Sequence, residues 1–237
     1  MSGVDDLQQR LSQLYRDPAE LAIDLFGIDW PPPVEDLAPS GGFAEIDECG
    51  AALVDSAEAL ATFDVYDEFG VGDEASHLVR DLVLSKLISV HESLPQPFGL
   101  VLIEGWRSQA RQELLFAIAQ QSAGDAATDY AADPRGVGGV VPPHSTGGAV
   151  DVTVSWNGHR LGLSTAVGIY DTRSSLTWLE SSAETVARDL RRLLYHSMVA
   201  QGFVGIAEEW WHYSYGDQQW AVRTGAPAAL FGSTTPR

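Results

Sequence analysis

Two short motifs far apart in the sequence constrain the fold more than any other feature. The segment from His144 to Asp151 places a histidine seven residues before an aspartate, and about sixty residues further on Glu209 stands three residues before His212. Two histidines and one aspartate form a suitable three-ligand set for catalytic zinc, with the fourth position left to water. Glu209 is then placed to take a proton from that water. The fold must bring both segments together for this site to exist.

Each motif also has an ordinary explanation when it is taken alone. Gly147 and Gly148 allow a tight turn, so a loop histidine and a strand aspartate can converge, but the same letters are compatible with an exposed surface turn. Glu209 and His212 share a face only on a helix, so a strand here needs a local irregularity for both to meet one metal. The alternative is an edge strand with Glu209 exposed. The joint occurrence of both motifs with a separate arginine favours the metal site.

That arginine is Arg107, which follows a predicted buried strand over 98–103. Its guanidinium always carries charge and offers several donors, so it suits a substrate carbonyl or a developing oxyanion. The alternative is an ion pair with one of the many acids of the chain. Trp106, Trp210 and Trp211 flank the candidate residues, and a dry aromatic shell would strengthen the electrostatics of a metal.

The composition restricts the possible partners and the compartment. The 237 residues carry 33 acids against 14 bases, for a net charge of −19, which repels nucleic acid and anionic membranes. Cys49 is the only cysteine, so no intrachain disulfide is possible. The N-terminus lacks the pattern of a signal peptide, and no apolar run reaches the roughly 20 residues that a bilayer requires. We therefore expect a cytoplasmic protein without nucleic-acid or membrane partners.

The order of the expected elements favours an α+β domain, because strands and helices mix without regular βαβ alternation. We expect residues 1–55 to form an N-terminal helical extension packed on the main body, and residues 56–237 to form the catalytic domain. The expected elements are a helix over 78–94, the strand over 98–103, a helix from Ser108 through 121, a long loop over 122–143, a strand over 149–154, and a helix from a capping box at Ser181–Glu184 to Gly202.

These residues resemble the D-alanyl-D-alanine dipeptidases, the VanX-type branch of the M15 zinc D,D-peptidases. The family pattern His-x-x-Gly-x-Ala-x-Asp, followed by Glu-Trp-Trp-His-Tyr, is matched over 144–151 and over 209–213. The family's Asp-Gly-Tyr-Arg-like element is represented by residues 104–107, and a weaker match lies at Asp67-Glu68-Phe69-Gly70. The tail over 215–221 is also similar, so the resemblance covers roughly residues 60 to 230.

The resemblance implies a fold, a cofactor and an activity. The fold would be the small α+β zinc D,D-peptidase fold of the hedgehog/DD-peptidase-like kind, with a central antiparallel sheet flanked by helices. One zinc ion per chain would be held by His144, Asp151 and His212, with Glu209 as general base and Arg107 stabilising the tetrahedral intermediate. The reaction would be the hydrolysis of D-alanyl-D-alanine to two D-alanines, and the partner would be a small D,D-dipeptide or short peptide.

Two departures from the family pattern concern substrate recognition. Pro142 stands where the family often has a serine, two residues before the first zinc histidine. The family's aspartate that binds the free ammonium of the dipeptide has no counterpart over 161–168. Asp171 is a candidate substitute, and Trp211 and Tyr213 are further candidates for contacting the substrate.

Two alternatives to the dipeptidase therefore stay open. The first is a D,D-carboxypeptidase or another small-peptide hydrolase that uses the same zinc site. The second is a non-catalytic, zinc-stabilised binding module, against which Glu209 and Arg107 argue, because structural zinc needs neither of them. The sequence does not fix the oligomeric state.

Overall fold

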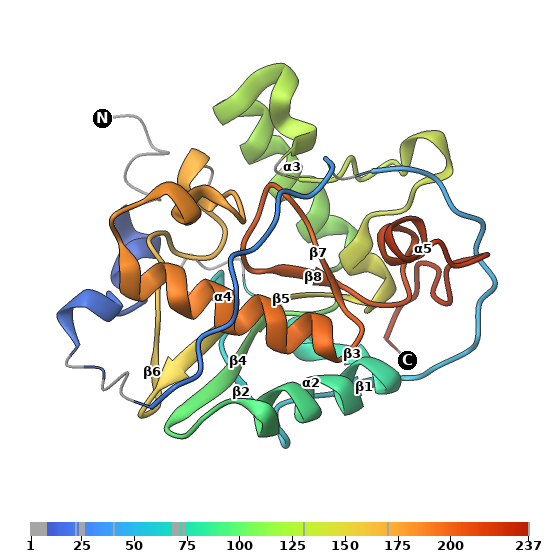
Figure 1. The fold of residues 1–237 in the computed structure, drawn as a ribbon. Coiled ribbons are helices and arrows are strands. Elements are labelled where there is room, and N and C mark those ends of the chain that lie inside the picture. The colour runs from blue at the N-terminus through green and yellow to red at the C-terminus, as the bar shows by residue number, and fades with distance from the viewer. Residues whose placement is uncertain are drawn as a thin grey trace.

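The computed structural model describes residues 9–21, 23, 27–39, 41–67, 72, 74–129, 131–169 and 171–236 (Figure 1). Residues 68–70 of the weaker family match lie outside these described residues, as does Tyr170 beside Asp171.

A mixed sheet forms the centre of the molecule. Its strands follow the order β2-β4-β5-β8-β7, with β6 paired to β5, and their bounds are β2 Ala61–Thr62, β4 Phe98–Glu104, β5 Ala149–Trp156, β6 His159–Arg160, β7 Val204–Gly205 and β8 His212–Ser214. All neighbours are antiparallel except β2, which runs parallel to β4 at the edge. A second, two-stranded sheet pairs β1 Leu53–Asp55 with β3 Leu78–Arg80. The expected α+β class is confirmed, and the expected antiparallel sheet is corrected only at β2.

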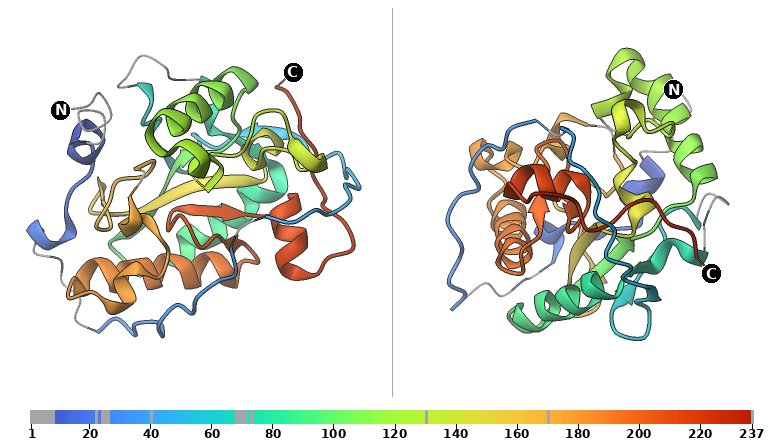
Figure 2. Two further views of the ribbon diagram at one scale, coloured as in Figure 1. Left: turned by 90° about the horizontal axis from the view of Figure 1, so that it is seen from above. Right: turned by 90° about the vertical axis from the view of Figure 1, so that its right-hand side faces the viewer.

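Helices cover both faces of the central sheet (Figure 2). The α-helices with printed bounds are α2 Asp81–Ser93, α3 Gln109–Ala123, α4 Thr185–Ala200 and α5 Gln218–Thr224. Helices α2 and α4 contact each other and pack on β4 and β5, and α3 lies on the opposite face. The apolar stripes of α2 and α4 that meet the core are fully buried: Val83, Leu87, Val90, Leu190, Leu194 and Met198. Their period near 3.6 explains why these segments are helical.

Short 3-10 helices connect the larger elements. They are η1 Pro18–Glu20, η3 Glu74–His77, η4 Gly124–Asp129, η5 Val137–Gly139, η6 Pro143–Thr146, η7 Thr172–Ser174 and η8 Trp178–Ser181. The long polar loop expected over 122–143 thus holds η4 and η5. Ser108 is the N-cap of α3, as predicted, because its hydroxyl accepts a hydrogen bond from the Arg111 N–H.

The capping box expected at Ser181 is wrong. Ser181 ends η8, and α4 begins after Glu184, whose N–H donates to the hydroxyl of Ser182. The C-terminal end of the same helix agrees with the prediction, since Gly202 adopts a φ of +85° two residues after it. In the described part of the chain, no helix combines the length and the apolar character that crossing a bilayer requires.

The described part of the N-terminal segment contacts the main body, and most of it has no regular secondary structure. It is helical at residues 9–13 and in η1, and Leu11 and Tyr15 from this part enter the main core. Residues 41–50 then pass beside the C-terminal segment, where the Ala229 N–H donates to the Glu45 carbonyl. The description of residues 1–55 as a helical extension and the domain boundary at residue 55 both stay predictions.

Candidate metal centre and its cavity

Strand pairing brings the two sequence motifs together. Asp151 on β5 lies directly opposite His212, the first residue of β8, so their side chains share one face of the sheet. His144 reaches the same face from η6, which immediately precedes β5. Glu209 lies in the turn before β8 and not in the strand. This turn is the local irregularity that the sequence requires for Glu209 and His212 to face one point.

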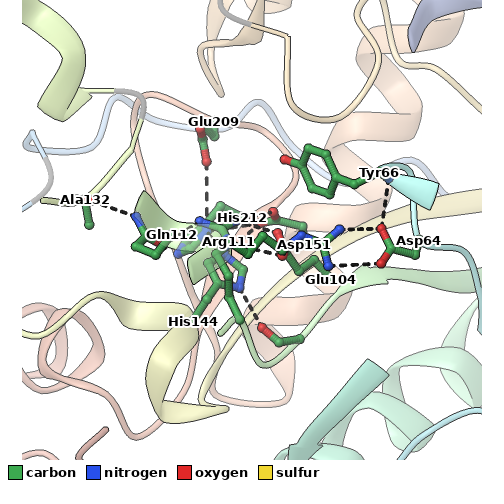
Figure 3. A network of polar contacts seen from close by, with 12 residues as sticks. Asp64, Tyr66, Glu104, Arg111, Gln112, Ala132, His144, Asp151, Glu209 and His212 are labelled. Carbon is green, nitrogen blue, oxygen red and sulfur yellow. Dashed lines mark hydrogen bonds and ion pairs between the residues drawn. The ribbon is translucent and has the colours of Figure 1, made fainter. Parts of the chain in front are cut away.

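The three ligand-type atoms form a compact triangle (Figure 3). The Nε2 atom of His144 lies 3.2 Å from Nδ1 of His212 and 3.4 Å from Oδ1 of Asp151, and His212 Nδ1 lies 3.1 Å from the same oxygen. Ligand atoms about 2.1 Å from a tetrahedral zinc ion stand about 3.4 Å from one another. The spacing and the chemistry of the donor atoms therefore fit such an ion.

Hydrogen bonding and burial prepare these atoms for a cation. His144 Nδ1 lies 2.8 Å from the carbonyl oxygen of Gly105, to which it donates, so the lone pair of Nε2 faces His212 and Asp151. All three side chains are buried. Burial by itself would raise the pKa of Asp151, but the charges and hydrogen bonds of His144 and His212 outweigh it and hold that pKa below its usual range. A cation would satisfy all three groups at once.

Two glycines set the backbone that carries His144 and its acceptor. The Gly105 N–H donates to the Ser76 carbonyl at 2.6 Å, and a Cβ at this position would lie 2.5 Å from the carbonyl oxygen of Leu78. Only a residue without a side chain permits so close an approach. Gly147 closes η6 with a φ of +70° and donates its N–H to the His144 carbonyl at 3.2 Å. The geometry of the metal site thus depends on backbone conformations that favour glycine.

Arg107 lines the cavity next to this triangle and forms an ion pair with Glu104. Its Nε donates to Glu104 at 3.0 Å, its Nη2 donates to the second Glu104 oxygen, and its Nη1 donates to Gln112 at 2.9 Å. Its Nη2 lies 3.9 Å from Asp151 Oδ2. Burial by itself would lower the pKa of Arg107, but the charge and hydrogen bonds of Glu104 outweigh it, so the pKa is raised. The ion pair that the sequence offers as one explanation is therefore present, with Glu104 as the partner, and the role toward a substrate stays a prediction.

A second layer of charge holds Glu104 in turn. Arg111 places its Nε 3.4 Å from Glu104 Oε1, and it also donates from Nη1 to Asp64 at 3.0 Å. Asp64 accepts a further hydrogen bond from the Tyr66 N–H at 2.9 Å (Figure 3). Sequence reasoning missed this network. The place of Glu104 in the same motif as Arg107 was the one signal that could have indicated part of it. The pairing of Arg111 with Asp64 left no local signal, because the two residues are 47 positions apart in the sequence.

Glu209 faces the triangle from the turn. Its Oε2 lies 3.9 Å from His212 Nδ1. Burial raises the pKa of Glu209 well above its ordinary value, and the nearby Asp151 charge raises it further. A carboxyl of this kind is suited to take up a proton and to give it away again.

A cavity of about 340 Å³ opens in front of these groups. The sequence-predicted residues among its lining are Arg107, His144, Asp151, Glu209, Trp211 and His212. Asp171 and Tyr213 are not among the described residues that line it. The Asp171 carboxylate is engaged by Arg173, at 2.7 Å between Oδ2 and Nη2, and Tyr213 is fully buried in β8. The structure thus brings together six of the eight predicted residues.

Comparisons with known proteins identify the family of the chain. One similar solved structure is that of the LdcB LD-carboxypeptidase, described as revealing the molecular basis of peptidoglycan recognition. The TM-score is 0.44 and the sequence identity is 18%, with 78% of this chain and 77% of that chain covered. A D-alanyl-D-alanine dipeptidase of Synechocystis sp. is 32% identical over 90 residues, which are 34% of this chain and 36% of the relative, so the alignment spans about a third of its length. The family model Peptidase_M15, described as D-ala-D-ala dipeptidase, matches residues 73–227, and the chain therefore belongs to this family of peptidases.

Proposed function

We propose that the protein is a zinc-dependent peptidase that hydrolyses D-alanyl-D-alanine to two D-alanines, with one zinc ion per chain. The observation that carries the proposal is the convergence of His144, Asp151 and His212 in a cavity that Glu209 and Arg107 also line. The family description and the name of the Synechocystis relative support the substrate. A cavity of about 340 Å³ lies at the small end of ligand sites, which suits a dipeptide.

Zinc is the proposed metal because mixed nitrogen and oxygen ligation suits it. His144, Asp151 and His212 would hold the ion. When bound, zinc would lower the pKa of water and polarise a carbonyl oxygen.

Glu209 is the proposed general base. Its carboxylate takes a proton from the water that attacks the scissile carbonyl carbon, and its raised pKa suits this task. As the carbon–nitrogen bond breaks, Glu209 passes the proton to the leaving amine. Two amino acids result, and Glu209 returns to its starting state.

Arg107 supplies a fixed positive charge for the transition state. Its side chain lines the cavity, and its contacts with Glu104 and Gln112 hold the guanidinium in one orientation. Negative charge that develops on the substrate carbonyl oxygen is stabilised without reorganisation of the site, which is the source of such electrostatic catalysis.

A D,D-carboxypeptidase is the second candidate, and one observation favours it. Residues 161–168 contain no acid, and the Asp171 carboxylate is engaged by Arg173, so neither offers an obvious partner for a free substrate ammonium. A D-alanyl-D-alanine with a blocked amino group separates the two candidates. A dipeptidase rejects the blocked substrate, whereas a carboxypeptidase cleaves it.

The proposal is tested by measuring zinc content and D-alanine release together. We expect the purified protein to hold one zinc ion and to release two D-alanines from each dipeptide. His212→Ala should lose the zinc ion, and Glu209→Gln should keep it and lose turnover, because the first variant removes a ligand and the second removes only the base. A zinc-loaded protein that is inert on every D,D-peptide would instead support the binding module.

A further inference from the structure

One buried side chain of the cavity has an unused hydrogen-bond donor. Gln219, in the first turn of α5, is 9% exposed and lines the same cavity as the metal triangle. Its Oε1 accepts a hydrogen bond from the Gly41 N–H at 2.9 Å. Because an N–H can only donate, this contact fixes the amide orientation and leaves Nε2 as the remaining donor group. Among the residues that the structure describes, Nε2 has no acceptor.

An unpaired buried donor of this kind indicates a ligand acceptor, because buried polar groups in folded proteins almost always have partners. The surroundings hold Gln219 in place. The neighbouring Gln218 accepts from the Val141 N–H at 2.9 Å and donates to the carbonyls of Ala44 and Gly139 at 2.7 and 3.1 Å. These bonds join three separate segments into one wall. The side chain of Gln219 therefore belongs to a preorganised wall of the cavity.

The charges of the cavity determine which acceptor needs this donor. Arg107 is the only arginine or lysine among the described residues that line it, and each of its three side-chain nitrogens already has an acceptor. The other charged groups of the lining are the carboxylates Asp133, Asp151, Glu208 and Glu209. Asp133 and Glu208, which have no part in the proposed reaction, oppose the approach of a substrate carboxylate, so a hydrogen-bond donor that faces the carboxylate would favour its binding. Gln219 Nε2 is such a donor and carries no competing charge.

Gln219 belongs to a different element from the residues proposed to serve the reacting bond. The turn that carries Glu209 precedes β8, whereas α5 begins beyond the end of that strand (Figure 1). Arg107 and the metal triangle already serve the scissile carbonyl in the proposed reaction. A second oxygen-bearing group of the substrate is left for Gln219.

We propose that Gln219 recognises the terminal carboxylate of the peptide substrate by donating a hydrogen bond from Nε2 to one of its oxygens. This inference rests on the proposed function, and it holds for both the dipeptidase and the carboxypeptidase, since the substrates of both end in a free carboxylate. Gln219 is then a specificity-determining residue that selects the carboxyl end of a peptide.

The test compares a free acid with its amide. D-alanyl-D-alanine and D-alanyl-D-alanine amide are titrated calorimetrically into zinc-loaded Glu209→Gln protein, in which turnover is blocked, with and without Gln219→Glu. The new glutamate still accepts from the Gly41 N–H but has no donor and repels a carboxylate. We expect affinity for the free acid to fall roughly ten- to a hundredfold and affinity for the amide to change little. Equal losses for both ligands, or no loss, would overturn the inference.

Two further variants control for charge and folding. Gln121→Glu makes the same charge change at an exposed position of α3 and should leave both affinities unchanged. Gln219→Ala removes the donor without adding charge, so it should weaken binding of the acid more than that of the amide even if Gln219→Glu unfolds. If the wild type hydrolyses the dipeptide while both Gln219 variants bind acid and amide as before, only the role of Gln219 fails. If the wild type leaves the dipeptide intact but the acid preference depends on Gln219, only the proposed function fails.

Discussion

Arg107 forms hydrogen bonds with more than one residue of the site. Arg107 binds Glu104 through two nitrogens and Gln112 through the third, while its Nη2 stays 3.9 Å from Asp151. The Glu104 pairing compensates the charge of the buried guanidinium, and the contacts fix its direction. Lysine offers one point charge in place of this fork, so it cannot reproduce the geometry.

Arg107→Ala should lower kcat/KM on D-alanyl-D-alanine by roughly a hundredfold or more, because an oxyanion contact of this kind contributes about 2.7–4 kcal/mol. Zinc content should stay at one per chain, since Arg107 is not a ligand. Metal analysis and steady-state kinetics on the same sample check both points. Arg107→Lys should recover only part of the activity. Full activity in the alanine variant would remove Arg107 from the mechanism.

At the scale of elements, the ends of strands place the chemistry. Strand β4 ends at Glu104, and the next two residues are hydrogen-bonded to the segment before α2, with the Trp106 N–H donating to the Leu78 carbonyl at 2.7 Å. The same exit presents the Gly105 carbonyl to His144 and the Arg107 side chain to the cavity. A shift of this short segment would therefore disturb metal binding and charge stabilisation together.

Gly105→Ala should produce that shift, because the new Cβ would lie 2.5 Å from the Leu78 carbonyl oxygen. We expect a lower midpoint of thermal unfolding and roughly a ten- to hundredfold loss of zinc affinity, the usual effect of losing a partner behind a metal ligand. Competition with a zinc chelator measures the affinity. Gly232→Ala is the matched control, because a Cβ there meets its nearest atom at 3.4 Å, an ordinary contact. Equal zinc affinity in both variants would contradict this account.

At the scale of the molecule, carboxylates fasten the N-terminal segment to the body. Glu180 accepts from the Val34 N–H at 3.0 Å and pairs with Arg192 on α4, and Glu48 pairs with Arg80 and accepts from the Gly232 N–H at 2.8 Å. Partial burial by itself would raise the pKa of each carboxyl, but these hydrogen bonds and charges outweigh it and lower both values. The segment that reaches the cavity at Gly41 is thus held by ionised groups.

Acid should loosen this attachment. A carboxyl whose pKa is lower in the folded state stabilises the fold above its unfolded pKa of about 4.3, and this contribution is lost as the pH falls through the folded value. We expect the protection of the Val34 N–H against hydrogen exchange to decrease as the pH falls below about 4.3. Glu180→Gln should reproduce part of that loss at neutral pH. Unchanged protection at pH 3, corrected for intrinsic exchange, would show that Glu180 does not hold the segment.

The sequence predicted the elements whose signals are local. The strand over 98–103, the N-cap at Ser108 and the helix end at Gly202 depend on neighbouring residues, and the structure contains all three. The capping box at Ser181 failed because Ser181 already belongs to η8. The leucine spacing over 4–26 predicts a helix interrupted at Pro18, and the described residues of that stretch are helical at 9–13 and in η1.

By itself the sequence determined the residue types of the metal site, their order and the need for an irregular backbone before His212. It could do so because ligand chemistry and strand periodicity are properties of short segments. Only the tertiary structure decided that Glu104 holds Arg107, that Asp171 is engaged by Arg173, and that Gln219 lines the cavity and keeps an unpaired donor. The first two pairings are close in sequence but depend on how the backbone turns, and the third depends on Gly41, 178 residues away, so the folded chain alone selects those partners.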